Sequence, residues 1–256
     1  MNGFGVLVAK ELRESWRTRR LPVVAGLFAI VGMISPLTAR YLPDILKATL
    51  GDQLTIPIPA PTATMAREQL QKNLGQLGAL AAIALAMGSV AGELDRGTAA
   101  LVLAQPVTRR AFLAAKLVAI GIVLAISTAL AVGIAWVYTG VLFETGSIGG
   151  WLAMAALAWL ALAAWGALTF LASAATGSTT AAAGLGFVGL VGLSIAAAVP
   201  AFDRYLPSGL VVPGIGLASG AADVDLAKLA TAVAGTLVII AISAAGAFVA
   251  FRNREL

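Results

Sequence analysis

The feature that most constrains this chain is a series of six apolar windows, each free of Asp, Glu, Lys and Arg. A helix needs roughly 20 apolar residues to cross the hydrocarbon core of a bilayer. Strands of a membrane barrel would show sustained alternation instead, which these windows lack. We therefore predict an all-α polytopic membrane protein with six transmembrane helices in one domain, residues 1–256. The windows are residues 21–39, 74–92, 117–140, 151–174, 180–200 and 229–251.

The overall composition excludes several classes of protein. Hydrophobic residues make up 60% of the chain and charged residues 11%, whereas soluble domains are about 25% charged. The chain contains no cysteine and no histidine, so thiolate chemistry, disulfides and the commonest general base and metal ligand are all missing. A GxxxxGK[ST] phosphate-binding loop is also absent from the sequence. We expect neither an enzyme nor a cofactor or metal site.

The distribution of basic residues predicts the orientation of the chain. Five Lys and Arg residues precede the first window, four lie in residues 93–116 and two follow the last window, against six on the other side. Lys and Arg accumulate on the cytoplasmic side of membrane proteins. We expect a multi-pass protein of the cell membrane with both termini in the cytoplasm. The net charge of +5 then sets orientation and does not indicate a nucleic-acid partner.

Residues 4–20 form an amphipathic pattern ahead of the first window. Such a helix would lie in the membrane interface, with its apolar face toward acyl chains and its basic face toward headgroups or a cytoplasmic partner. The alternative is a charged flank that only orients the first span. The apolar face comprises Phe4, Leu7, Val8, Leu12 and Trp16, and the basic face Lys10, Arg13, Arg17 and Arg20.

Two outer segments differ from simple loops. In residues 40–73, prolines at alternate positions favour an extended run, and a short helix capped by Thr62 or Thr64 is expected to lead into the second span. A flexible linker is an equal alternative for the proline run. Residues 201–228 are too apolar for a solvated loop and too rich in Gly and Pro for a span. We expect this stretch to insert partly, with non-helical backbone buried in protein.

A compact charged segment, residues 93–116, separates the second and third windows. A short helix is expected over residues 97–105, capped by Asp95 and ended by Pro106. Its Leu101 and Leu103 would be apolar side chains exposed to water. Such a helix fits a docking element for a cytoplasmic protein; the alternative is an inert loop. Thr108 is expected to cap the next helix, and Arg109, Arg110 and Lys116 to mark the membrane boundary.

None of the six windows carries a charged relay, whereas ion-coupled transporters usually keep one inside the membrane. The segment Glu93-x-x-Arg96-Gly97-Thr98, with Leu101, Leu103, Pro106, Thr108-Arg109 and Lys116, resembles the first cytoplasmic loop of type-2 ABC transporter permeases of the exporter type. The motif Lys10-Glu11-Leu12-Arg13, followed by Arg17 to Arg20, is similar to the N-terminal motif of that family.

The resemblance implies a permease subunit that pairs with a second permease subunit and couples to a separate cytoplasmic ATP-binding cassette subunit. By position, it assigns coupling to Glu93, Arg96, Gly97, Thr98, Leu101 and Leu103. It assigns the interfacial helix to Lys10, Glu11, Arg13 and Arg17. An ATPase-independent secondary transporter or channel is the alternative, and a membrane scaffold is a third reading. The apolar spans favour a hydrophobic or amphipathic cargo over a small ion.

Overall fold

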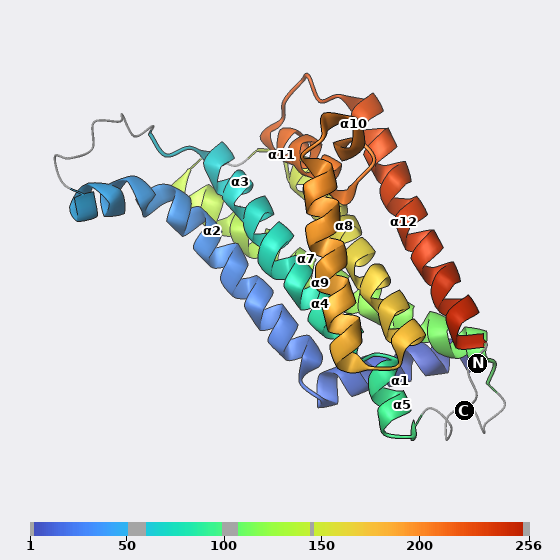
Figure 1. Ribbon diagram of the computed structural model, residues 1–256. Helices are drawn as coiled ribbons and strands as arrows, with labels where there is room; N and C mark the ends of the chain where they lie inside the picture. Colours follow the sequence, from blue (N-terminus) through green and yellow to red (C-terminus); the bar gives the residue numbers. More distant parts are fainter. Residues whose placement is uncertain (1–2, 51–59, 99–106, 144–145, 253–256) are drawn as a thin grey trace.

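The computed structural model describes residues 3–50, 60–98, 107–143 and 146–252, and every regular element in them is helical. Within these described ranges, six helical segments are long and apolar enough to cross a membrane, as the sequence predicts. They form one bundle in which α1 and the last turn of α12 lie at the same end (Figure 1). The segments are Arg20–Ile45, Ala63–Asp95, Arg109–Leu142, Ile148–Thr176, Thr179–Ala197 and Leu226–Arg252.

The N-terminal helix α1 (Gly3–Arg17) packs against the first part of α7. Its apolar face is divided, because Leu12 packs against the core whereas Phe4 and Trp16 are 42% and 63% exposed. The chain then turns sharply at Arg19, which has a left-handed φ of 61°. Helix α2 (Arg20–Leu50) follows and continues past Pro36 and Pro43, well beyond the predicted end of the first span.

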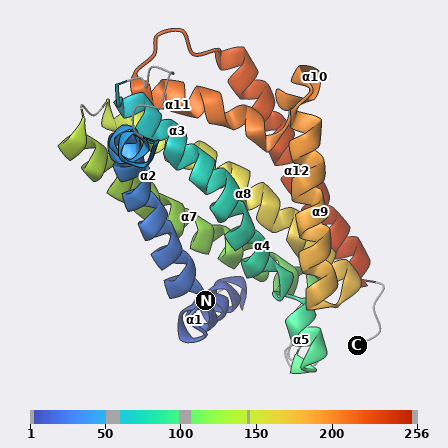
Figure 2. The same cartoon turned by 60° about the vertical axis from the view of Figure 1, so that its left-hand side comes forward.

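The second span consists of four helical pieces. Helix α3 (Ala63–Asn73) begins at Thr62, whose hydroxyl accepts a hydrogen bond from the Met65 backbone N–H, so the predicted cap is confirmed. A π-helical turn, η2 (Leu74–Gly78), leads into α4 (Ala79–Met87). The helix breaks after α4, and the short α5 (Ala91–Asp95) projects from the end of the bundle (Figure 2). Asp95 thus ends α5.

The next three spans are continuous helices with hydroxyl caps. Thr108 caps α7 (Arg109–Leu142), as predicted, Ser147 caps α8 (Ile148–Thr176) and Ser178 caps α9 (Thr179–Ala197). The turn between α8 and α9 is tight because Gly177 adopts a φ of 68°, which glycine reaches without a steric penalty. Because of this turn, α8 and α9 pack against each other as antiparallel neighbours.

Residues 200–219 form three short helices where the sequence predicts a mostly non-helical stretch. They are α10 (Pro200–Asp203), the 3₁₀ helix η3 (Pro207–Leu210) and α11 (Val211–Ser219). Helix α11 lies across the end of the bundle opposite α1 and α5 (Figure 2). Short helices satisfy the backbone polar groups internally, which explains how so apolar a segment packs against α8. Helix α12 (Leu226–Arg252) then returns through the bundle.

The core of the bundle contains α2, α4, α7 and α8, while α9 and α12 lie at its periphery. Small residues permit the close approaches: a Cβ added to Gly32 of α2 would collide with the Ala131 carbonyl of α7. Helix α9 buries only Ala182 and Gly186. Its remaining surface is available to lipid or to another protein.

Candidate functional site

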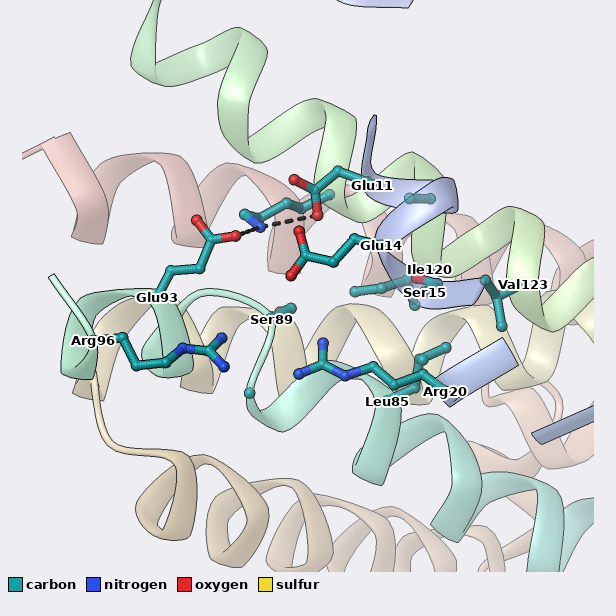
Figure 3. Close-up of a pocket in the computed structure, with 13 residues that line it drawn as sticks. Glu11, Glu14, Ser15, Arg20, Leu85, Ser89, Glu93, Arg96, Ile120 and Val123 are labelled. Atoms are coloured by element: carbon teal, nitrogen blue, oxygen red, sulfur yellow. Dashed lines mark hydrogen bonds and ion pairs between the residues drawn. The ribbon is translucent and has the colours of Figure 1, made fainter. Parts of the chain in front are cut away.

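Three elements far apart in sequence meet at a buried ion cluster, which we define as Glu11, Glu93 and Lys116. The ammonium of Lys116, in the second turn of α7, lies 2.5 Å from Glu93 Oε1 and 3.0 Å from Glu11 Oε2. The side chains of Lys116 and Glu93 are only 3% and 5% exposed. Figure 3 shows the two carboxylates converging on one amine from α1 and α5. Because charges this deeply buried must be paired, the cluster locks α1 and α5 onto α7.

Two further residues of α1 surround the cluster. The Lys10 ammonium lies 3.0 Å from Glu11, 3.3 Å from Glu14 and 3.7 Å from Glu93. Burial is the largest single influence and would lower the pKa of Lys10, but the carboxylates of Glu11, Glu93 and Glu14 together outweigh it, so the pKa lies above its ordinary value. Burial is likewise the largest single influence on Glu14 and would raise its pKa, but the positive charges of Lys10, Lys116 and Arg20 together outweigh it, so the pKa lies below its ordinary value. Both shifts favour the charged forms.

A small hollow of about 20 Å³ lies beside the cluster. Arg20 and Arg96 extend into it from opposite sides, and Ser89 lines it near the end of the second span (Figure 3). Within the described residues, Glu93 Oε2 is buried and lacks a hydrogen-bond partner. A hollow of this size has room for about one water molecule, which could satisfy that oxygen.

The three carboxylates of Glu11, Glu14 and Glu93 offer oxygen atoms within 4.8 Å of one another, a spacing that could hold a cation. The Lys116 ammonium, however, already bridges two of them. The positive charges of Lys10, Arg20 and Arg96 are also close by. The arrangement is therefore a set of ion pairs between helices, in which the Lys116 ammonium occupies the place that a metal cation would take.

The break in the second span is held by a side chain from α8. The buried Ser173 hydroxyl accepts hydrogen bonds from the backbone N–H groups of Val90 and Ala91 and donates one to the Met87 carbonyl, at 3.3, 3.0 and 2.8 Å. The first turn of α5 has no other cap among the described side chains. Ser173 thus fixes where α4 ends and where the charged segment leaves the bundle.

The structure brings only some of the sequence-predicted residues together. Glu93 and Glu11 belong to the cluster, Lys10 lies at its edge, and Arg96 lines the hollow. Gly97 turns the chain with a φ of 68°, and the Thr98 hydroxyl donates to the Glu93 carbonyl. Arg13 and Arg17 are exposed on α1, away from the cluster. The predicted coupling helix, with Leu101 and Leu103, falls largely on residues 99–106, which lie outside the described residues.

Sequence reasoning missed the structural roles of three residues. Lys116 was expected at the membrane boundary but is buried and ion-paired. Glu14 was not singled out, although its position four residues after Lys10 is an ion-pair spacing on a helix. Ser173 lies within an apolar window, residues 151–174, whose sequence gives no reason to single it out. Nothing in a single sequence links Ser173 to a helix break more than eighty positions earlier.

The fold and the cluster define a polytopic helical membrane protein whose N-terminal helix is ion-paired to the base of its second and third spans. The chain belongs to the ABC-2 family transporter proteins, because the model of that family matches residues 6–204. It is also similar to the uncharacterized transmembrane protein YxlG of Bacillus subtilis (strain 168). The two are 28% identical over 205 residues, which cover 79% of this chain and 77% of the relative. The predicted permease family is thereby confirmed.

Proposed function

We propose that this protein is the permease subunit of an ATP-driven exporter, coupled to a separate cytoplasmic ATP-binding cassette subunit. Membership of the ABC-2 family supports a transport role in the membrane. The described spans offer no charged side chain at their centres, so an energy source outside the bilayer fits them better than an ion gradient.

The ion cluster is the observation that carries the proposal. The segment between α5 and α7 begins just after Glu93 and ends at a helix whose second turn contains Lys116, and these two side chains are paired. The two helices that flank the segment, α5 and α7, are thus joined through this ion pair. A displacement of the segment by an ATPase would move α5, α7 and, through Glu11, α1 together. A segment that served only as a linker would need no such anchor.

The functional unit proposed here contains two permease subunits. Helix α9 supports this, because it buries little within one subunit and exposes Val188 and Phe187 at 65% and 52%. A Val188→Cys variant of this cysteine-free chain should crosslink to a second copy in native membranes. A Val238→Cys variant, on the exposed face of α12, is the matched comparison. Exclusively monomeric, transport-competent protein would contradict the pairing.

The cargo proposed is hydrophobic or amphipathic. The polar groups inside the spans are mainly hydroxyls such as Ser127 and Thr128, both buried in α7. Scattered hydroxyls can guide an amphiphile but offer little to replace the hydration shell of a small ion.

The experiment that tests the coupling replaces Leu101 and Leu103 together by Asp. If the two leucines fill a pocket on the ATPase, each contributes about 1.5–3 kcal/mol of docking free energy. The double variant should then fail to copurify with a protein carrying a GxxxxGK[ST] loop and should lose transport-linked ATP hydrolysis. Its amount in the membrane should stay normal, because the segment lies outside the spans.

The matched control places the same two charges in an exposed turn at the other end of the bundle, as Ala221→Asp with Ala222→Asp. This control should keep the complex and its coupled turnover. Normal complex formation and turnover in the Leu101→Asp, Leu103→Asp variant would reject the coupling role. Transport that persists without any ATPase would favour a secondary transporter or channel.

A further inference from the structure

Two open hollows lie along the same faces of α7 and α12, and neither is used by the ion cluster. The first, of about 440 Å³, lies where α7 begins and α12 ends and is lined by Arg109, Arg110 and Arg252. The second, of about 400 Å³, lies further into the spans and is lined almost wholly by apolar side chains from α7, α8 and α12. Figure 1 shows that α7 and α12 meet near the ends that are predicted to face the cytoplasm. From there the two helices diverge along the bundle, with α8 between them.

The two hollows align along one stripe of each helix. On α7 the first hollow includes Leu113 and the second begins at Leu117, one helical turn later. On α12 the first hollow includes Phe248 and Arg252 and the second includes Leu237, and these three residues lie within about 60° of one another around the helix. We call this feature the α7–α12 cleft.

The end of the cleft where α7 begins is closed by contacts between the two helices and is positively charged. Arg109 donates to the carbonyl of Arg252 at 3.0 Å and lies 6.0 Å from the centre of the Phe251 ring, and Phe251 stacks on Phe112 with ring centroids 5.9 Å apart. These contacts hold α7 and α12 together at this end. Arg110 and Arg252 are exposed, and no Asp or Glu is among the described residues that line either hollow.

We propose that the α7–α12 cleft binds one anionic phospholipid, with its phosphate at Arg110 and Arg252 and an acyl chain in the apolar hollow. Charge and length both select this occupant. Arginine is suited to bidentate recognition of phosphate. From Arg109 to Ala125 the stripe on α7 spans about 24 Å, close to the thickness of one leaflet with its headgroups, about 20–22 Å.

A cytoplasmic protein could contact the arginines but could not reach the apolar hollow, which lies within the spans. The floor of that hollow is fixed by Trp159, whose indole N–H donates to the Gly121 carbonyl at 2.9 Å. A bound lipid would join α7 to α12, which otherwise contact each other mainly at the arginine end. It would thereby couple the last span to the helix that carries Lys116.

The test uses the purified full-length protein and native mass spectrometry. The probes are phosphatidylglycerol and phosphatidylcholine with identical 18-carbon chains. The wild-type protein should retain one phosphatidylglycerol in preference to phosphatidylcholine. The Arg110→Gln, Arg252→Gln variant should bind phosphatidylglycerol about tenfold or more weakly, because each arginine near a headgroup contributes about a fivefold attraction. The control is Arg40→Gln with Arg204→Gln, which removes the same charge from exposed positions outside the cleft.

A second pair of variants tests the acyl-chain hollow without removing a charge. Neither Gly121 nor Gly133 of α7 would bring an added Cβ within 4 Å of another group. Gly121→Leu would fill the hollow and should reduce retention of phosphatidylglycerol about tenfold, whereas Gly133→Leu, on the same helix outside the cleft, should not. In a variant that keeps Trp159 as its one tryptophan, brominated phosphatidylglycerol should quench the fluorescence more than brominated phosphatidylcholine does.

Several results would overturn the proposal. Equal retention in the arginine variant and its control would remove the headgroup site. Equal retention in Gly121→Leu and Gly133→Leu would show that the anion binds at the arginines alone. If the arginine variant lost the ATP-binding subunit while its lipid retention stayed normal, the arginines would belong to a protein interface. Equal quenching by both brominated lipids would leave only a non-selective lipid shell.

Discussion

The Ser173 hydroxyl of α8 lies 3.0 Å from the backbone nitrogen of Ala91, across the break in the second span, and accepts its hydrogen bond. The same oxygen accepts from Val90 and donates to Met87, so one buried side chain satisfies three backbone groups that the break leaves unpaired. The position of α5, and with it of Glu93, therefore depends on the neighbouring helix α8.

Ser173→Ala should destabilise the α4–α5 break. Unsatisfied buried backbone groups cost about 1–3 kcal/mol, and the free energy of unfolding in detergent should fall by that order. Hydrogen exchange at residues 88–95 should rise. Ser194→Ala is the control, because the Ser194 hydroxyl donates to the Leu190 carbonyl on an exposed face of its own helix. Unchanged exchange in Ser173→Ala would show that the break is held by packing alone.

Lys116→Met should be among the most destabilising single changes in the chain. It leaves the buried carboxylate of Glu93 and the partly buried carboxylate of Glu11 without their shared cation, and breaking a buried ion pair costs about 3–5 kcal/mol. Lys10→Met should cost less than about 1 kcal/mol, since the Lys10 side chain is 42% exposed. Thermal unfolding in detergent measures both variants. Similar losses for the two would mean that the cluster does not lock the helices.

The docking of α1 should depend on pH at both extremes. The lowered pKa of Glu14 contributes stability above its unfolded value of 4.5 that is lost as pH falls through the folded pKa. The raised pKa of Lys10 contributes stability below 10.5 that is lost as pH rises through the folded pKa. Hydrogen exchange of α1 should therefore be slowest, relative to an unstructured peptide, between these limits.

Glu14→Gln tests the acid side of this dependence. It should raise the hydrogen-exchange rate of α1 at pH 7. It should also reduce the change in that rate between pH 7 and pH 4, because the variant lacks the carboxyl group whose pKa is lowered. Arg13→Gln, at an exposed position of the same helix, is the control. An acid response that is identical in Glu14→Gln and the wild type would assign it to other groups.

Gly150→Ala should displace α11 from α8. A Cβ at Gly150 would collide with the Leu217 carbonyl oxygen, whereas a Cβ at the adjacent Gly149 would meet nothing within 4 Å. Overpacking of this kind costs about 1–3 kcal/mol, so Gly150→Ala should lower the unfolding temperature. Gly149→Ala should leave it unchanged or raise it slightly, because alanine favours the helix. Equal effects of the two substitutions would contradict the close contact.

Six spans require both ends of the chain on one side of the membrane. Reporter proteins fused after Leu256 and inserted within residues 50–60 should report opposite sides, with the fusion after Leu256 cytoplasmic. The reason is the excess of Lys and Arg on that side. Two reporters on the same side would contradict the number of spans, and a periplasmic or extracellular C-terminus would contradict the orientation.

The sequence by itself determined the six spans, the cap at Thr108 and the helical class, and it narrowed the cap of α3 to Thr62 or Thr64. Each of these depends on local properties: the length of an apolar run, or a hydroxyl placed before a helix. The same locality explains why α1 was predicted as an amphipathic helix. The division of its apolar face into buried and exposed parts was not predicted, because the packing of Leu12 against the core depends on α7.

The tertiary structure decided what the charges do. Glu11, Glu93 and Lys116 are separated by 82 and 23 positions, and their ion pairs exist only because α1, α5 and α7 meet at one end of the bundle. Packing likewise brings Arg110 and Arg252 to one hollow. It also places the Ser173 hydroxyl where it can accept a hydrogen bond at the break in the second span. A single sequence records the residue types and their local periodicity, but side chains on different helices become neighbours only through packing.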